Sequence, residues 1–204
     1  MQADSSAAQQ DQTPDANRLG PLRMAGVHGA VGLGLLALFA VADTWQVASG
    51  VPLATLFAVI AGLLAGAILT TLIHEWFHFL GVKLGRAHYH GVASAGLFAY
   101  DWDFNRNSVH QFKLMSVAGS VGSIAAVILF ATMIPADNGG RIALQASAWG
   151  SLAFAAAIEW PVLRRVSQGV EPLTALSGIT PGVLYRSALF ALGTLLFAAY
   201  LLAD

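Results

Sequence analysis

The residues best suited to chemistry are His74, Glu75 and His78, which form an HExxH motif. Residues four apart lie on the same face of an α-helix, so His74 and His78 can bind one metal ion. Glu75 follows His74 directly and lies close enough to act on a water bound to that ion. The motif therefore predicts a metal-dependent hydrolase, with zinc (Zn²⁺) on the two histidines and Glu75 as the general base.

The residues on both sides of the motif are apolar and place it inside a membrane. Residues 63–69 read Leu-Leu-Ala-Gly-Ala-Ile-Leu, and residues 79–82 read Phe-Leu-Gly-Val. Ionisable side chains at membrane depth are costly and usually serve a function. The competing interpretation is two histidines packed in a helix bundle beside an interfacial glutamate, which assigns no chemistry to the motif.

Composition also indicates an integral membrane protein. Hydrophobic residues make up 56% of the chain and charged residues 10%, whereas a soluble domain has about 25% charged residues. The net charge of -1 argues against a nucleic-acid partner. The chain has no cysteine, so histidines and carboxylates must hold any metal. Residues 1–20 are polar and are predicted to be a disordered tail, and residues 21–204 a single polytopic membrane domain.

The expected fold is an all-α bundle in the lipid bilayer. Five apolar segments are long enough to cross it, near residues 25–48, 53–83, 112–134, 142–163 and 181–202. The second is longer than one upright crossing needs, so it is expected to tilt or to protrude. Residues 84–111, between the second and third helices, are predicted to form a short hairpin or a re-entrant loop.

Basic residues are distributed unevenly between the two predicted membrane sides. Of the ten lysines and arginines, Arg141 alone falls on the second side. Basic residues concentrate on the cytoplasmic side of membrane proteins. The N-terminus is therefore expected in the cytoplasm and the C-terminus outside, and we expect the membrane to be a bacterial inner membrane.

Two features together resemble the site-2 protease family of intramembrane zinc metalloproteases. One is the HExxH motif in a membrane helix, and the other is Ala118-Gly119 in the helix that follows the loop. The resemblance covers about residues 60–130. It implies proteolysis of membrane-embedded substrates, with zinc on two histidines and an acidic third ligand. The chain departs from the family at Phe77, where a small residue is usual, at Ser120, where a proline is usual, and in lacking the Asp-Gly segment that supplies the third ligand.

Glu159 is the best candidate for the missing third ligand. It lies near the cytoplasmic end of the fourth segment, in the same membrane half as His74 and His78. A buried carboxylate must be neutralised, paired or bound to a metal. The alternative is an interfacial glutamate that pairs with Arg164 or Arg165.

Other polar residues are weaker candidates. Glu171, Asp101 and Asp103 are acidic alternatives in loops, and His88 and His90 are possible further ligands or channel groups because alternate residues of a strand share a face. His28 is more simply an interfacial residue.

Small residues four apart in the third segment predict close helix packing. The pairs are Ala118 with Gly122 and Gly119 with Ser123. They serve either packing alone or packing against the motif helix in a way that shapes the active cavity, and the two are compatible.

Three functions are compatible with the sequence. The leading one is a zinc-dependent intramembrane endopeptidase acting on a membrane protein or peptide. The second is a membrane di-iron oxygenase or hydroxylase, whose histidine boxes also contain HxxxH, although this chain has six histidines and no HH pair. The third is a non-enzymatic small subunit of a larger membrane complex.

Overall fold

The computed structural model describes residues 18–204, so residues 1–17 of the predicted disordered tail lie outside the described residues. The helices are α1 (Pro21–Ser49), α2 (Pro52–Leu84), α3 (Val109–Met133), α4 (Gly139–Ser167), α5 (Pro172–Leu176) and α6 (Pro181–Ala203). Among the described residues, every helix except α5 is long and apolar enough to cross a membrane. The predicted all-α fold with five spanning helices is confirmed, and each helix end lies within four residues of the predicted one.

The predicted hairpin between the second and third helices is also confirmed. Strands β1 (Tyr89–His90) and β2 (Asp101–Trp102) pair in antiparallel fashion. Leu19, just before α1, forms an isolated β-bridge with Val92. The start of α1 is thereby tied to the segment between the two strands.

Local sequence signals explain where the helices begin and end. Proline occupies the first turn of α2 at Pro52 and of α6 at Pro181, where its missing N–H has no helical partner to lose. Ser108 and Gln111 form a reciprocal capping box at the start of α3. Gly50 ends α1 in the left-handed conformation, with φ 61°, which glycine adopts without a steric cost.

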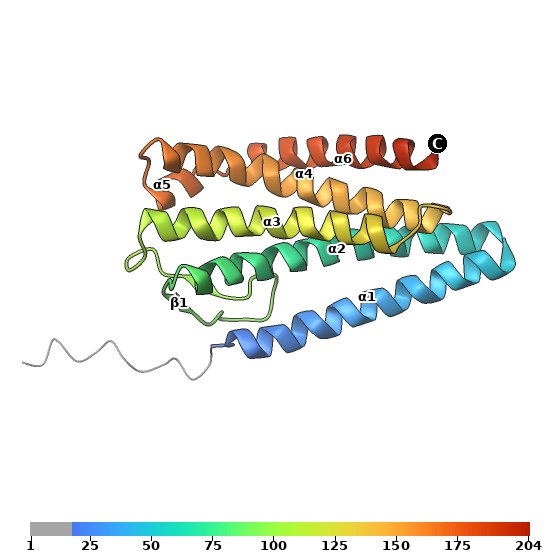
Figure 1. Cartoon of the computed structure of the whole chain (residues 1–204), viewed down its shortest axis with the longest axis horizontal. Coiled ribbons are helices and arrows are strands. Elements are labelled where there is room, and N and C mark those ends of the chain that lie inside the picture. The colour runs from blue at the N-terminus through green and yellow to red at the C-terminus, as the bar shows by residue number, and fades with distance from the viewer. Residues whose placement is uncertain (1–17) are drawn as a thin grey trace, which may run out of the picture.

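The five long helices form a bundle with α2, α3 and α4 at its centre (Figure 1). α1 packs beside α2, and α6 packs beside α4. The chain runs back and forth along the bundle, so that the start of α1 and the C-terminus lie at opposite ends (Figure 1). This arrangement agrees with an odd number of crossings.

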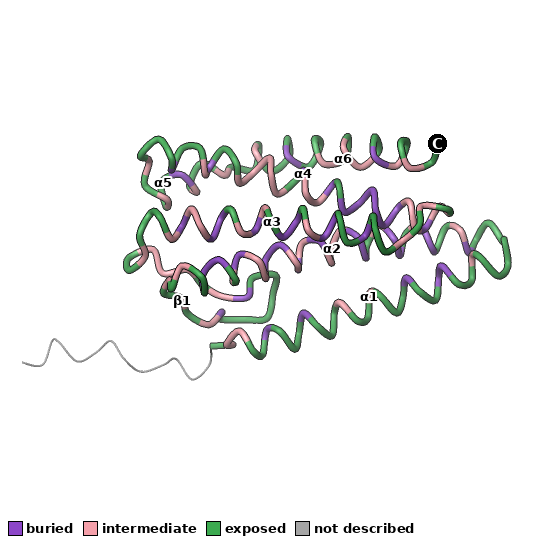
Figure 2. Tube along the Cα trace, in the orientation of Figure 1, coloured by how far each residue is buried: buried purple, intermediate pink, exposed green. Residues whose placement is uncertain are grey.

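Burial separates the central helices from the outer ones. The most apolar windows of α2, α3 and α4 are 39%, 44% and 44% buried, against 17% for α1 and 11% for α6. Figure 2 shows the same contrast, with buried segments along the central helices and largely exposed outer ones. The exposed side chains of α1 and α6 include many large apolar residues. These two helices therefore offer the broadest surface to lipid.

Glycines allow α2 to approach both of its central neighbours closely. A Cβ atom on Gly62 or Gly66 would collide with the backbone of α4 at Gly140 and Leu144. On the other side of α2, a Cβ on Gly81 would lie 2.8 Å from the Cβ of Ala118 in α3. Small residues at these positions let helix backbones pack at short range, which fixes α2 between α3 and α4.

The charged residues mark the two ends of the bundle. Nine of the ten lysines and arginines lie in or beside the end that carries the hairpin, which we call the basic end: Arg18, Arg23, Lys83, Arg86, Arg106, Lys113, Arg164, Arg165 and Arg186. At the opposite end Arg141 forms ion pairs with Asp43, at 2.8 Å, and with Asp137, at 2.9 Å.

Candidate metal centre

The structure brings His74 and His78 of α2 together with Glu159 of α4. Glu159 Oε1 lies 2.7 Å from His74 Nε2 and 3.1 Å from His78 Nε2. One ligand atom from each residue lies within 4.8 Å of the other two. Within residues 18–204, these three form the one group of histidine and acidic side chains close enough to hold a metal ion.

The outer nitrogens of both imidazoles are held by α3. His74 Nδ1 lies 2.9 Å from Ser123 Oγ, and His78 Nδ1 lies 2.8 Å from the carbonyl oxygen of Met115. Histidines that bind metals commonly use their second nitrogen in this way, which fixes the ring orientation. Both Nε2 atoms are thereby directed at Glu159.

The His78 hydrogen bond determines what can lie between His78 and Glu159. A carbonyl oxygen only accepts, so Nδ1 of His78 must carry the proton and donate it to Met115. In a neutral ring Nε2 then presents a lone pair to the Glu159 carboxylate, 3.1 Å away. Two lone pairs at this distance repel each other. The arrangement therefore needs a cation between them, which is either a proton carried by His78 or by Glu159, or a metal ion.

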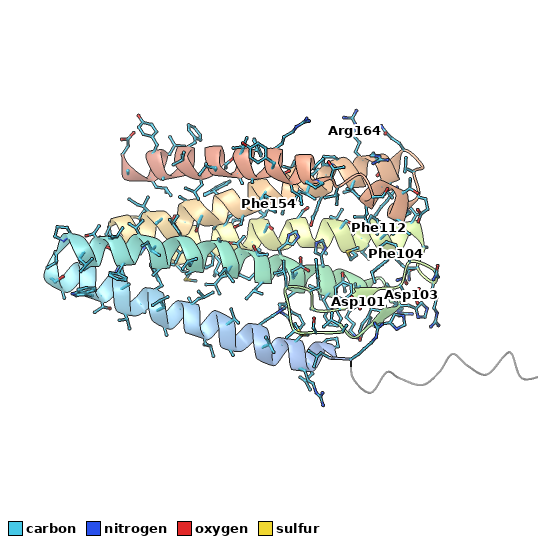
Figure 3. The ribbon with its side chains drawn as sticks, turned by 180° about the vertical axis from the view of Figure 1, so that it is seen from behind. Asp101, Asp103, Phe104, Phe112, Phe154 and Arg164 are labelled. Carbon is cyan, nitrogen blue, oxygen red and sulfur yellow. The ribbon has the colours of Figure 1, made fainter. Side chains whose placement is uncertain are left out.

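The second carboxylate oxygen of Glu159 supports the same interpretation. Oε2 is buried and has no hydrogen-bond partner, an arrangement that is costly for a carboxylate unless a ligand completes it. The alternative ion pair with Arg164 or Arg165 does not occur among the described residues, since Glu159 pairs with the two histidines. Figure 3 shows Arg164 pointing away from the bundle.

Glu75 is close to this group without belonging to it. Its side chain is 8% exposed and lines the same cavity as His74, His78 and Glu159. It does not share the Glu159 contact that joins the two histidines. This leaves its carboxyl group available for a different role.

A cavity of about 990 Å³ extends from the three candidate ligands along the bundle. Its lining comes from α2, α3, α4, α5, α6 and the hairpin, and most of it is apolar. On α2 the lining runs from Leu63 to His78, which corresponds to about 22 Å at 1.5 Å per residue. Figure 3 shows Phe154 of α4 in the space between α2 and α6, and Phe104 and Phe112 toward the basic end.

The hairpin contributes a tyrosine to the cavity wall. Tyr100, beside β2, lines the cavity. Burial raises the pKa of its phenol, and the negative charges of Glu75 and Glu159 raise it further. The side chain therefore stays protonated near neutral pH and can donate a hydrogen bond into the cavity.

The remaining candidates from the sequence have other partners. His90 Nε2 lies 3.2 Å from Asp103 Oδ2, and Asp101 Oδ2 lies 3.1 Å from Arg18. The backbone N–H of His88 donates to Asn107. Glu171 caps α5, where the N–H groups of Thr174 and Leu173 lower the pKa of its carboxyl. None of these side chains belongs to the metal-binding group.

The small residues of α3 have a direct role at the site. A Cβ on Gly119 would overlap the imidazole of His78, and a Cβ on Gly122 would lie 2.6 Å from the Cβ of Phe77. Ser123, paired with Gly119 in the sequence pattern, contacts His74. Helix packing and the shape of the site thus depend on the same residues.

Sequence reasoning did not identify the contacts of Met115, Ser123 and Tyr100. The small-residue pattern was the available signal for Ser123, because it placed that residue on the face of α3 next to α2. A main-chain carbonyl such as that of Met115 has no sequence signature. Comparison with known protein families, characterised proteins and solved structures found no match to this chain, so any functional inference depends on the site itself.

Proposed function

We propose that this protein is a zinc-dependent intramembrane endopeptidase of the site-2 protease type. The observation that carries the proposal is the group of His74, His78 and Glu159, in which the His78 lone pair and the Glu159 carboxylate need a cation between them. Two imidazoles, one carboxylate and one open position are typical of catalytic zinc sites. Imidazole and carboxylate are also the donors that this cysteine-free chain offers.

Each residue of the motif has a role in the proposed reaction. When bound, zinc supplies a Lewis acid that polarises the scissile carbonyl and lowers the pKa of a water toward about 7. Glu75 takes a proton from the attacking water and passes it to the leaving amine. Met115 and Ser123 hold the two imidazoles so that their Nε2 atoms keep facing Glu159.

The cavity supports a membrane-embedded protein or peptide substrate. Thr71 and Ser151 both donate to the carbonyl of Ala67, and Ser147 donates to that of Leu144. These three hydroxyl groups donate to helix backbones and leave the unpaired Thr70 Oγ1 for a substrate. An extended peptide along the mostly apolar cavity would therefore find few partners at membrane depth. A substrate segment can satisfy its own backbone there as a helix and unwind only near Glu75.

The number of candidate ligands favours this function over a di-iron oxygenase. Two irons need a larger set of histidine and acidic ligands than the three side chains that converge here among the described residues. The remaining alternative is a non-enzymatic subunit of a larger membrane complex, and experiment must distinguish it from the protease.

We also propose that the basic end faces the cytoplasm of a bacterial cell and that the C-terminus lies outside. The nine basic residues at that end support this orientation. Reporter fusions at the two termini should report opposite sides of the inner membrane. The same side for both would contradict the proposed topology.

The decisive experiment combines metal content with hydrolysis. The purified chain should contain one zinc per molecule, and Glu75→Gln should retain that zinc while losing cleavage of fluorogenic transmembrane peptides. Glu171→Gln is the matched control, because Glu171 caps α5 and belongs neither to the cavity lining nor to the metal-binding group. It should keep both zinc and activity. Unchanged cleavage by Glu75→Gln would refute the protease proposal, and a parent that binds zinc without cleaving any peptide would favour the subunit role.

A further inference from the structure

His28 of α1 joins the motif helix to the hairpin. Its Nδ1 accepts a hydrogen bond from Trp76 Nε1 at 3.0 Å, and its Nε2 lies 2.8 Å from the carbonyl oxygen of Gly96. The side chain is buried, with 5% exposed. The imidazole and the Trp76 indole also meet edge to face, with ring centroids 5.9 Å apart. His28 thus contacts a residue inside the HExxH motif and a residue between the two strands.

The two hydrogen bonds require one form of the imidazole. The indole N–H of Trp76 only donates, so His28 Nδ1 must be unprotonated. The Gly96 carbonyl only accepts, so His28 Nε2 must carry the proton. A neutral ring with its proton on Nε2 satisfies both partners. His28 is therefore a matched donor and acceptor, which differs from the interfacial histidine expected from the sequence.

The segment held by His28 has little else to anchor it. Among residues 18–204, the His28–Gly96 contact is the one hydrogen bond that joins residues 93–99 to the rest of the protein. The next anchors along the chain are the Leu19–Val92 bridge and the pairing of β1 with β2. Residues 93–96 read Ala-Ser-Ala-Gly and offer only small side chains for packing.

The same segment covers part of the candidate site. Leu97, Phe98 and Tyr100 line the cavity that contains Glu75. Leu97 and Phe98 are 42% and 61% exposed, whereas Ala99 between Phe98 and Tyr100 is fully buried. The position of this segment therefore decides how the cavity is closed at the Glu75 side.

We propose that His28 is a positioning residue that holds residues 93–99 closed over the cavity through its paired bonds to Trp76 and Gly96. In the closed position Leu97 and Phe98 contribute to the substrate-binding wall. Loss of the two hydrogen bonds of His28 should weaken substrate binding and leave the chemistry at Glu75 unchanged. The kinetic part of this inference rests on the proposed function, and the structural part does not.

The structural test uses the absence of cysteine from the chain. An Ala99→Cys reporter in the purified full-length protein is buried while the segment is closed, so its reaction with a water-soluble maleimide reports opening. His28→Leu should raise the labelling rate about two- to tenfold per hydrogen bond lost. His28→Gln supplies one acceptor and one donor and should stay near the parent rate. A Ser167→Cys reporter at the exposed last residue of α4, with and without His28→Leu, controls for general changes in reactivity.

The controls decide whether the hydrogen bonds of His28, or only the packing of its ring, hold residues 93–99 in place. Gly96→Ala keeps the carbonyl, and its Cβ would meet open space, so it should leave labelling unchanged. Equal labelling in His28→Leu and the parent would overturn the proposal, and so would His28→Gln behaving like His28→Leu. If His28→Leu does not fold, Trp76→Phe decides the question, because it removes the indole donor and keeps an aromatic ring. Faster labelling in Trp76→Phe supports the role of the hydrogen bonds, and an unchanged rate overturns the proposal.

The kinetic test separates this inference from the proposed function. With a fluorogenic transmembrane peptide, His28→Leu should raise KM several-fold at nearly constant kcat. A fall in kcat at constant KM would contradict the positioning role. A parent protein that cleaves no peptide would refute the proposed function, and the labelling result would still decide whether His28 holds the segment.

Discussion

Replacing Gly119 by alanine tests how the α3 surface positions His78. The added Cβ would lie 2.6 Å from His78 Nδ1 and closer still to other atoms of the ring. The ring cannot move away freely, because Nδ1 is bonded to the Met115 carbonyl and the His74 ring lies 4.4 Å away between centroids. The substitution must therefore either shift the imidazole or separate α3 from α2.

The size of the effect follows from these contacts. Overpacking a close helix contact costs about 1–3 kcal/mol, and loss of the His78–Met115 hydrogen bond adds about 1 kcal/mol. Displacing a ligand through the group that orients it lowers metal affinity by about 10- to 100-fold. We expect Gly119→Ala to lower both the zinc affinity by that factor and the free energy of unfolding by about 2–4 kcal/mol.

Competition with a chromogenic chelator measures the zinc affinity, and unfolding in mixed micelles measures stability. Gly122→Ala is the matched control, since its Cβ would press on Phe77 and not on an imidazole. It should lose similar stability while keeping more of the zinc affinity. Gly193→Ala has open space around it, so it should keep the zinc affinity and gain at most about 1 kcal/mol of stability from helix propensity. Equal zinc affinities for Gly119→Ala and Gly122→Ala would refute the reasoning.

Three further outcomes are expected. Glu159→Gln should lower zinc content measured by elemental analysis, and a full equivalent of zinc in that variant would exclude Glu159 as a ligand. Asp43→Ala removes the bidentate partner of Arg141 and leaves Asp137 paired with it, so it should lower the free energy of unfolding by about 1 kcal/mol; an unchanged value would contradict a role for this pair. Although desolvation acts to raise it, hydrogen bonds from His90 and two backbone N–H groups hold the pKa of Asp103 below its usual 3.8. The ionised Asp103 carboxyl thus stabilises the segment between α2 and α3 above pH 3.8, and this contribution is lost as the pH falls through the lowered pKa. NMR of the Asp103 carboxyl should show a titration midpoint below 3.8 that rises in His90→Ala.

The fold could be predicted because its main signal is hydropathy over long segments. Each spanning helix is an apolar run bounded by proline, glycine or capping residues, so its existence follows from local sequence. The helix ends could be predicted only to within about one turn. α4, for example, includes Pro161 and continues four residues beyond the predicted end at 163. The short helix α5 carries no long apolar run and was not predicted.

The candidate site was predictable where residue types are scarce. The chain has three glutamates, and Glu159 is the one outside the motif that lies at the depth of the motif. That was enough to nominate it, and the structure places it beside both histidines. The contacts of His28 could not be predicted, because they join residues 48 and 68 positions apart. Such contacts depend on how α1 and the hairpin pack, which local sequence does not specify.

The glycine contacts between α2 and α4 divide the protein into a stiff part and an adaptable part. The two histidines and Glu159 lie on the two helices that Gly62 and Gly66 bring into backbone contact. The spacing of the ligands is therefore set by the bundle core and is insensitive to what lies on its flanks. α6 and the hairpin supply other walls of the same cavity, and α6 is largely exposed. Under the proposed function, exchanging side chains on α6 should change substrate preference while the ligand geometry stays constant, which makes this helix the natural place to redesign selectivity.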